Sequence, residues 1–528
     1  MTNRAQPLET SRDVPLAHLT AGVLDSRADV AHIHITDVTL DSRAVTPGAL
    51  FLACRGARRH GLEFAGEAIA AGARAILYDP QASGETLPAA AAAVTAASPE
   101  RAVFLAGVPQ LGEQAGTIAD RFFGAPSQLL AVTGVTGTNG KTTSAYLLAQ
   151  ALTRLGRTTG YIGTLGAGFP GAIAPFGLTT ADVVTVHRQL AHLRALGADC
   201  VAMEVSSHAL EQGRVNGVRF RAAAFTNLTR DHLDFHGSMD AYGAAKTRLF
   251  ERDVAARIIN VDDAFGLALA RRFAGAAGGL VVTSRALGAE AAGAMRRAQY
   301  VCARRVQPLP GGSSLTIESS FGSAHLEVPL LGDFNVDNVL TVLGVLLALG
   351  LRLEQAVAAL GACSAPPGRM EILGREGGVL AIVDYAHTPD ALANALRAAR
   401  AHCRGTLCVV FGCGGDRDPG KRPMMGRTAR ALADDIVVTD DNPRTEDPQR
   451  IVAGILEGIG AGAAVRVEHD RAKAIRGTLE RASAGDVVLI AGKGHEDYQL
   501  IGDERRAFSD QAVARAWFAG KEPACRAR

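Results

Sequence analysis

Residues 134–143 read Gly-Val-Thr-Gly-Thr-Asn-Gly-Lys-Thr-Thr and follow directly on the apolar run Leu-Leu-Ala-Val at 129–132. This order predicts a buried strand, a glycine-rich turn and a helix over 144–155. Such a turn binds a nucleoside triphosphate: backbone N–H groups surround the phosphate oxygens, Lys141 adds positive charge, and the Thr142 hydroxyl ligates Mg²⁺. The general pattern G-x-x-x-x-G-K-[ST], aligned on Gly140, Lys141 and Thr142, places its first glycine at position 135. Here that position is valine, and the glycines stand at 134, 137 and 140. The loop is therefore a subtype of the general pattern.

Composition narrows the class of protein. A chain of 528 residues has room for roughly three or four domains. Lys and Arg number 55 against 53 Asp and Glu, which removes the electrostatic case for binding nucleic acid or an acidic membrane surface. The eight cysteines include no Cys-x-x-Cys pair, which favours the reduced thiols of a cytosolic protein. Residues 1–20 contain no apolar stretch, so we expect no signal peptide and a cytoplasmic location. We also expect an enzyme that acts as a monomer.

Short apolar runs alternate with helical stretches, which predicts an α/β protein. The central strand before the phosphate loop and the Ala-Pro-Pro-Gly linker at 365–368 suggest three domains: 1–126, 127–364 and 365–528. In the central domain we predict strands at 200–205, 222–225 and 255–261, a helix at 183–196, a β meander within 298–330 and a helix at 336–349. In the third domain we predict strands at 380–384, 407–411, 435–439 and 486–491.

Polar residues follow two of the central strands. Glu204 ends the strand at 200–205, where a carboxylate beside a phosphate loop is well placed to hold Mg²⁺. Residues 231–236 contain two histidines and two aspartates, and His232, as a neutral imidazole, is the candidate metal ligand; a capping role for Asp231 is the alternative. Lys246 lies on a predicted helix, where a lysine taken alone would be expected at the solvated surface.

Each of the four predicted strands of the third domain runs into a glycine-rich or charged loop, at 384–390, 412–418, 441–444 and 492–496. One such loop would be read as an ordinary solvated turn. Four of them on one sheet indicate a ligand site beyond the carboxyl ends of the strands.

Taken together these motifs resemble the Mur ligase family. The matching segments are TGTNGKTT at 136–143, EVSSH at 204–208, the NLxxDHLDxH segment at 227–236, GDFNVDN at 332–338, GRME at 368–371 and DYAHTPD at 384–390. The resemblance covers residues 36–510 and implies a three-domain α/β fold with a central P-loop ATPase domain and a C-terminal Rossmann-like domain. Two segments, LDSR at 40–43 and DNPR at 441–444, are similar to those of the branch that adds 2,6-diaminopimelate to UDP-N-acetylmuramoyl-L-alanyl-D-glutamate.

The resemblance also implies site residues. For ATP they are Gly137, Thr138, Asn139, Gly140, Lys141, Thr142, Thr143, Asn335 and Asn338, and for Mg²⁺ they are Thr142, Glu204, His232 and a Lys246 carbamylated by CO₂. Lys141, His232 and Lys246 are the implied catalytic residues. The nucleotide-sugar precursor would contact Leu40, Ser42, Ala57, Arg58, Arg59, Thr179, Thr180, Ser206, Gln212 and Arg214. The incoming amino acid would contact Arg417, Asp441, Asn442, Pro443, Arg444, Gly492 and Glu496.

Two positions depart from the family pattern, both in the precursor-binding region. Ala181 follows Thr180 where proline is common, and His60 precedes Gly61 where an acidic residue is usual.

The DNPR loop leads us to expect meso-diaminopimelate rather than L-lysine as the added amino acid. The planar fork of Arg444 suits a carboxylate at the far end of the substrate, and lysine has none there. Asp441 and Glu496 would balance the ammonium of the same distal centre.

Two other functions remain as alternatives. A folylpolyglutamate synthase would share the phosphate loop but lack a uridine-binding first domain, which LDSR argues against. A nucleotide-switch protein would need no pocket for a second substrate, which the loops of the third domain argue against.

Overall fold

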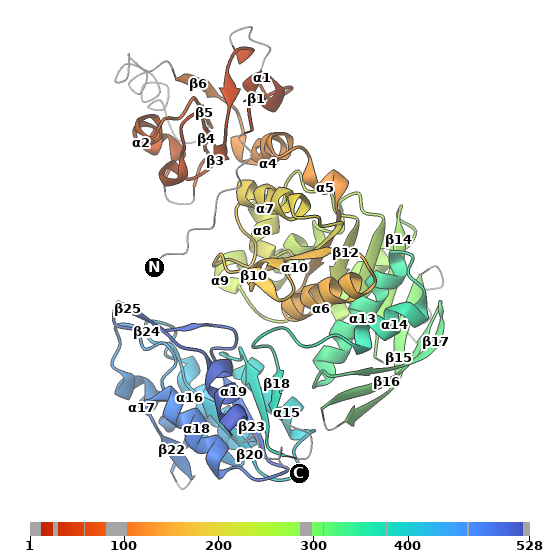
Figure 1. Ribbon diagram of the computed structural model, residues 1–528, viewed down its shortest axis with the longest axis vertical. Helices are drawn as coiled ribbons and strands as arrows, with labels where there is room; N and C mark the ends of the chain where they lie inside the picture. The colour runs from red at the N-terminus through yellow and green to blue at the C-terminus, as the bar shows by residue number, and fades with distance from the viewer. Residues whose placement is uncertain are drawn as a thin grey trace, which may run out of the picture. The chain divides into compact units, whose positions relative to one another are not determined.

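The computed structural model describes residues 12–24, 30–56, 59–80, 103–285, 298–309, 311–374, 378–461 and 464–520. The chain divides into two compact units. The first unit consists of Met1–Lys141, Leu152–Ile258 and Gly275–Leu280, and the second consists of Thr142–Ala151, Ile259–Ala274 and Val281–Arg528. The division falls within the helix α6 (Lys141–Arg154) and the strands β13 (Ala256–Asn260) and β14 (Gly279–Ser284). Figure 1 labels α6 and β14.

The N-terminal part of the first unit is built on a parallel four-stranded sheet. Its order is β3-β4-β5-β6, from β3 (Val38–Thr39), β4 (Leu50–Ala53), β5 (Ala75–Tyr78) and β6 (Phe104–Gly107). One face packs on α4 (Leu111–Phe122) through Leu50, Leu52 and Ile118, and the other on α2 (Ala65–Ala70) through Phe51 and Ile69. Successive strand residues thus point to opposite faces, and both faces are covered.

The same unit contains the phosphate-loop strand β7 (Ala131–Thr136) inside the strand order β10-β9-β8-β11-β7-β12. The buried parallel strands β11 (Cys200–Glu204) and β12 (Ala222–Phe225) flank β7, and β8 (Thr159–Gly163) pairs with the outer side of β11. This confirms the predicted strands near 200 and 222. The helix predicted at 183–196 is α7 (Val183–Ala195). Sequence analysis did not predict β8 or the short strands β9 (Gly166–Phe169) and β10 (Ala172–Ala174).

In the second unit β15 (Gln299–Leu309), β16 (Gly312–Ser319) and β17 (Gly322–Val328) form an antiparallel meander, as predicted. The strand β14 pairs with β15 in parallel. The helix predicted at 336–349 begins three residues earlier, as α13 (Asp333–Ala348), because Gly332 at φ 86° precedes it. It is followed by α14 (Leu353–Gly361).

The C-terminal sheet has the order β18-β19-β23-β20-β21-β22. Its parallel strands β19 (Leu380–Asp384), β20 (Leu407–Phe411), β21 (Asp435–Val438) and β23 (Val487–Ala491) agree with the predicted strands to within one residue. The edge strands are β18 (Glu371–Gly374), antiparallel to β19, and β22 (Val465–Val467), parallel to β21. A hairpin of β24 (Tyr498–Ile501) and β25 (Glu504–Ala507) follows β23.

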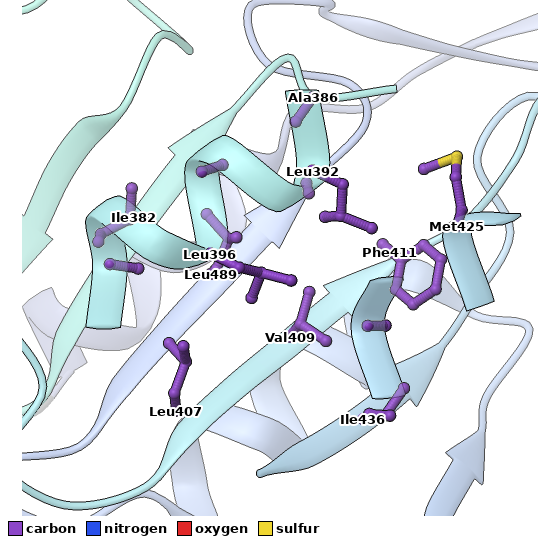
Figure 2. Close-up of a cluster of buried hydrophobic side chains, with 14 of the residues drawn as sticks. Ile382, Ala386, Leu392, Leu396, Leu407, Val409, Phe411, Met425, Ile436 and Leu489 are labelled. Atoms are coloured by element: carbon purple, nitrogen blue, oxygen red, sulfur yellow. The ribbon is translucent and has the colours of Figure 1, made fainter. Parts of the chain in front are cut away.

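Helices cover both faces of this C-terminal sheet. Val409 packs among side chains of α15 (Pro389–Arg400), α16 (Lys421–Leu432) and α17 (Pro448–Ile459), and Figure 2 shows part of this cluster. Its neighbour Val410 packs on the opposite face with α18 (Arg471–Arg481) and α19 (Asp510–Gly520). With both faces covered, the edge formed by the carboxyl ends of the parallel strands is where polar loops gather.

No helix in the described part of the chain is long and apolar enough to cross a membrane.

Candidate active site

The phosphate loop is held by the end of strand β12. A side chain at Gly137, whose φ is 152°, would place its Cβ 1.9 Å from Thr226 Oγ1, so only glycine fits there. The Thr226 hydroxyl donates to Asn139 O at 2.5 Å, and Asn139 N donates to Asn227 Oδ1 at 3.0 Å. Gly140 has a φ of 85° just before α6 begins. These glycines and hydrogen bonds hold the loop backbone in a curved form.

Two lysines meet at one carbonyl of this loop. Lys141 Nζ donates to Gly137 O at 2.9 Å and to Thr138 O at 2.8 Å, and Lys246 Nζ donates to Gly137 O at 2.8 Å. Lys246 lies on α10 (Met239–Thr247), is 1% exposed, and has its ammonium 4.3 Å from the ring centre of Tyr242. Its burial excludes the surface-lysine interpretation. Desolvation, with the nearby Lys141 charge, holds the pKa of Lys246 well below its usual range.

Glu204 is fully buried at the end of β11. Its Oε1 accepts hydrogen bonds from the Tyr161 hydroxyl and, at 2.9 Å, from Thr164 N, and its Oε2 accepts from Thr164 Oγ1 at 3.2 Å. The Thr164 hydroxyl also lies 3.1 Å from Thr179 Oγ1. Hydrogen bonding to both oxygens fixes the direction of this carboxylate, as is usual for residues that support a metal site.

The predicted metal ligand His232 has a left-handed backbone with φ 52° and a side chain that is 45% exposed. Its ring centre lies 4.8 Å from that of His208 and 6.0 Å from that of Tyr242, and Tyr242 OH lies 3.1 Å from Thr138 Oγ1 in the phosphate loop. Burial, reinforced by the neighbouring histidines, lowers the pKa of His208. Tyr242 therefore contacts both the His232 ring and the phosphate loop.

The described residues contain no group of three or more His, Cys, Asp and Glu side chains arranged to hold a metal ion. The predicted donors include only two of these types, Glu204 and His232, beside the Thr142 hydroxyl and a modified Lys246. Glu204, the Thr142 hydroxyl and a carbamate on Lys246 are oxygen donors, which suit Mg²⁺, an ion that keeps several waters and takes its remaining ligands from substrate phosphates; His232 would add one nitrogen donor. The residues present thus fit a magnesium ion that binds together with a nucleotide.

The predicted precursor contacts near β11 form one hydrogen-bonded group. Thr180, 1% exposed, donates to Glu204 O at 3.0 Å and accepts from Ser206 N at 3.2 Å. Arg214 Nη1 donates to Thr180 O at 2.9 Å, and its Nε donates to Gln212 Oε1 at 2.9 Å. The structure therefore brings these residues together with the buried Glu204.

The predicted contacts in the N-terminal sheet lie at its carboxyl edge. Leu40 is half-buried after β3, Ser42 Oγ donates to Glu67 Oε2 at 3.1 Å, and the exposed Arg59 lies with its guanidinium 4.4 Å from the ring centre of Phe64. Two predicted contacts, Ala57 and Arg58, lie outside the described residues.

His60, one of the two atypical positions, has a structural role. Its Nδ1 accepts from Leu62 N at 3.0 Å, while its own N–H donates to Glu63 Oε1 at 2.9 Å. The imidazole thus caps the short 3₁₀ turn Gly61–Phe64 in the way that a serine or aspartate caps a helix.

Asn335 and Asn338, the predicted adenine contacts, are almost fully buried on α13. Asn335 Nδ2 donates to Leu331 O at 2.9 Å, Asn338 Nδ2 donates to Asn335 Oδ1 at 3.0 Å, and Ser144 Oγ donates to Asn338 Oδ1 at 3.3 Å. These bonds tie the start of α13 to α6, the helix that follows the phosphate loop. Each amide nitrogen carries a second N–H besides the one used in these bonds.

In the C-terminal part the loops after β20 and β21 are in close contact. A side chain at Gly415 would place its Cβ 1.9 Å from Pro443 O. Arg444, half-buried with a left-handed φ of 53°, donates from Nη1 to Gly415 O at 2.7 Å, and its N–H donates to Leu500 O at 3.0 Å. Arg417, a further predicted contact, is exposed. Strained backbone at a non-glycine residue persists where the surroundings hold it, and functional sites are common places for it.

The loops after β21 and β23 also meet. Asn442 Nδ2 donates to Glu496 Oε2 at 2.9 Å. At Gly492, φ 119°, a Cβ would lie only 3.2 Å from Asp441 Oδ2. Four residues predicted to hold the amino acid are therefore neighbours, as the open-sheet pattern requires.

Sequence analysis missed two buried cations beside these residues. Lys493 is fully buried, with Nζ 3.0 Å from both Asn442 Oδ1 and Glu496 Oε2. Arg471, 1% exposed, forms a two-bond ion pair with Asp510 and donates to Ala491 O at 2.9 Å at the end of β23. The only signal for Lys493 is its place between two glycines in a loop that follows a buried strand, and Arg471 has none.

Comparisons with known proteins agree with this geometry. Family models match residues 34–110 (Mur ligase family, catalytic domain), 135–346 (Mur ligase middle domain) and 368–494 (Mur ligase, glutamate ligase domain). The chain is 50% identical over 473 residues to the UDP-N-acetylmuramoyl-L-alanyl-D-glutamate–2,6-diaminopimelate ligase of Xanthomonas campestris pv. campestris (strain 8004), covering 89% of this chain and 91% of that protein. It is 49% identical over 476 residues to the ligase of the same name from Alkalilimnicola ehrlichii, covering 89% and 92%.

A solved structure of a UDP-N-acetylmuramoyl-L-alanyl-D-glutamate–2,6-diaminopimelate ligase is 32% identical, has a TM-score of 0.69, and covers 96% of this chain and 99% of its own. The predicted three-domain α/β architecture is thereby confirmed, while the exact domain boundaries stay a prediction. The family also accounts for a nucleotide loop followed by a doubly wound C-terminal sheet. This chain belongs to the Mur ligase family.

Proposed function

We propose that this protein is the ATP-dependent ligase that joins meso-2,6-diaminopimelate to UDP-N-acetylmuramoyl-L-alanyl-D-glutamate during synthesis of the peptidoglycan precursor. The observation that carries the proposal is the identity of about half the residues with diaminopimelate ligases over nine-tenths of both chains. Asn442 donates to Glu496, and Lys493 contacts Asp441, Asn442 and Glu496. These contacts, with Arg444 on the same loop, support the proposal because they assemble a polar site for a charged amino acid.

The reaction needs ATP because a carboxylate is a poor acyl donor to an amine at neutral pH. A carboxylate oxygen of the UDP-linked dipeptide attacks the γ-phosphorus of ATP, the bond to the bridging oxygen breaks, and ADP leaves. The diaminopimelate amine then attacks the carbonyl carbon of the acyl phosphate. The tetrahedral intermediate expels phosphate, and the amine loses a proton to leave an amide. Bound Mg²⁺ supplies charge neutralisation at the phosphates.

The chain's own residues prepare the phosphoryl transfer. Lys141, now bonded to two loop carbonyls, would turn toward the β- and γ-phosphates and offset their charge. Glu204, His232 and the Thr142 hydroxyl would hold Mg²⁺. The backbone N–H groups of residues 137–143 would surround the phosphates, and Asn335 and Asn338 would lie near the adenine. The group around Thr180 and Arg214, with Ser42 and Leu40, would hold the nucleotide sugar.

Lys246 is proposed to carry a carbamate formed from CO₂. Only the neutral amine reacts with CO₂, and the buried position of Lys246 beside the Lys141 ammonium favours that form. The product is an anion beside the phosphate loop, where it would act as a magnesium ligand. CO₂-depleted enzyme should lose activity and regain it with bicarbonate. An enzyme insensitive to CO₂ whose Lys246→Arg variant is fully active would contradict this assignment.

We propose that the protein acts in the cytoplasm as a monomer; the absence of a Cys-x-x-Cys pair from the sequence supports a reducing compartment. Centrifugation of the purified enzyme at working concentration would contradict the monomer if it showed a concentration-independent dimer.

The function is tested by phosphate release from ATP. We expect little release with ATP alone and full turnover only when UDP-MurNAc-L-Ala-D-Glu and meso-diaminopimelate are both present. A nucleotide switch would hydrolyse ATP without them. A folylpolyglutamate synthase would instead turn over with a folate and glutamate, and either result would exclude the proposal.

A further inference from the structure

The end of β23 carries a cation that none of the predicted roles uses. Lys493 has no exposed surface, and its Nζ lies 3.0 Å from Asn442 Oδ1, 3.0 Å from Glu496 Oε2 and 3.5 Å from Asp441 Oδ1. Three residues that the sequence assigns to the amino acid thus converge on one ammonium group. We call Asp441, Asn442, Lys493 and Glu496 the distal cluster.

Lys493 sets the orientation of the Asn442 amide. Asn442 Oδ1 accepts from Lys493 Nζ and, at 2.9 Å, from Leu500 N. With the oxygen facing these two donors, the nitrogen must face Glu496, and Nδ2 donates to Glu496 Oε2 at 2.9 Å. Reversing the amide would set N–H groups against two other N–H donors. One Glu496 oxygen therefore receives two bonds from the cluster, which holds the carboxylate in a single direction.

Lys493 also sets the charge of the cluster. Asp441 is 7% exposed and the Glu496 side chain is 16% exposed, so two uncompensated carboxylates here would be costly. Arg471, a second buried cation beside the end of β23, is already paired with Asp510. With Lys493 in place the cluster holds two negative charges and one positive, and one negative charge remains. One substrate ammonium is what such a cluster can neutralise, while Arg444 on the same loop supplies positive charge for a carboxylate.

We propose that Lys493 is a positioning residue for the distal ammonium of the incoming diamino acid: it holds Asn442 and Glu496 in one arrangement and leaves the distal cluster with a single negative charge. The proposal rests on the proposed function. Lys493 contacts Asp441, Asn442 and Glu496, the residues proposed to bind the diamino acid, so its loss should weaken diamino acid binding without altering use of the other substrates.

The test compares Lys493→Met, which keeps the apolar stem and removes the charge, with Lys493→Arg, which keeps the charge. Lys473→Met is the matched control, because Lys473 lies in the same domain with its side chain 66% exposed. Phosphate release gives kcat and KM for each of the three substrates, and thermal unfolding followed by circular dichroism reports folding.

We expect Lys493→Met to raise KM for diaminopimelate by about 100-fold or more, the usual scale for removing one partner of a buried hydrogen-bonded charge pair. KM for ATP and for the UDP precursor should stay within about twofold of wild type. Lys493→Arg should recover part of the loss, and Lys473→Met should match wild type. If the methionine variant does not fold, Lys493→Gln, whose amide donates without charge, gives the same comparison.

Two results would overturn the inference alone: an unchanged KM for diaminopimelate in a folded Lys493→Met enzyme, or a fall in kcat with all three KM values unchanged, which a merely structural role produces. A wild-type enzyme that releases no phosphate with diaminopimelate would instead overturn the proposed function, and the inference with it.

Discussion

Replacement of Arg444 is the sharpest test of how this enzyme selects its amino acid. The Arg444 guanidinium is held before substrate arrives, because Nη1 donates to Gly415 O at 2.7 Å. Its Nε and Nη2 form one edge of the planar fork and, under the proposed function, would donate two parallel bonds to the distal carboxylate of meso-diaminopimelate. Hydrogen bonds to charged groups contribute about 1.5–3 kcal/mol each, so two such bonds are worth about 3–6 kcal/mol. Because Arg444 is half-buried, solvent screening favours the lower part of that range.

For Arg444→Ala we therefore expect kcat/KM for meso-diaminopimelate to fall by about 10²–10³-fold, at about 1.4 kcal/mol for each factor of ten. Arg444→Lys keeps the charge but loses the fork, and should lie between alanine and wild type. With L-lysine, which has no distal carboxylate, the wild type should be slower by roughly 10⁴-fold. The alanine substitution should change that low rate little.

The assay is phosphate release at saturating ATP and UDP precursor, with the diamino acid or L-lysine varied. Arg450→Ala is the matched control, because Arg450 is exposed on α17 in the same domain. The reasoning is refuted if Arg444→Ala retains wild-type kcat/KM for meso-diaminopimelate, or if the wild type uses L-lysine equally well.

Three further predictions concern the loops and one buried histidine. Lys141→Ala should abolish ATP-dependent ligation while the circular dichroism spectrum stays native, since this lysine supplies charge rather than packing; near-normal turnover would exclude the phosphate-loop assignment. Gly415→Ala should raise KM for diaminopimelate by about tenfold or more, because its Cβ would lie 1.9 Å from Pro443 O and the loop must move. Gly66→Ala, with open space at its Cβ, is its control and should match wild type. Burial lowers the pKa of His187 from 6.5 to about 4. The unfolded chain therefore protonates His187 at a higher pH than the folded chain does, and the free energy of unfolding falls as pH falls from 6.5 toward 4. The loss is at most about 3.4 kcal/mol, from 2.5 pH units at about 1.36 kcal/mol each. Urea unfolding of wild type and His187→Gln at pH 7 and 4.5 measures the difference, and equal losses in both proteins would contradict the assignment.

Much of the fold follows from local pattern. The strands of the C-terminal sheet appear as continuous runs of Val, Ile, Leu and Phe, because helices bury both faces of each strand. The phosphate loop is equally local, since its glycines, lysine and threonine lie within ten residues of chain. By contrast β8, β9 and β10 lie in a glycine-rich stretch without clear alternation, and their pairing depends on partners elsewhere.

The candidate site was predicted in its residue types but not in its contacts. Sequence pattern placed Asp441, Asn442 and Glu496 after strands of one sheet, and the family resemblance assigned their role. Lys493, which joins them, was missed because its partner Asn442 lies 51 residues away in the chain. In the same way, only the hydrogen bonds of the folded chain show that His60 caps a turn.

The sequence by itself determined a glycine-rich phosphate loop and a doubly wound sheet with charged loops at one edge, and it predicted a carboxylate and an imidazole as metal ligands. These features depend on residues close in the chain, where backbone geometry and hydrophobic periodicity act. Only the tertiary structure decided that Lys246 is buried against Gly137 O and that Lys493 neutralises a carboxylate. Burial and charge pairing are set by residues distant in sequence, and the free energy of a charged group depends on the surroundings that those residues provide.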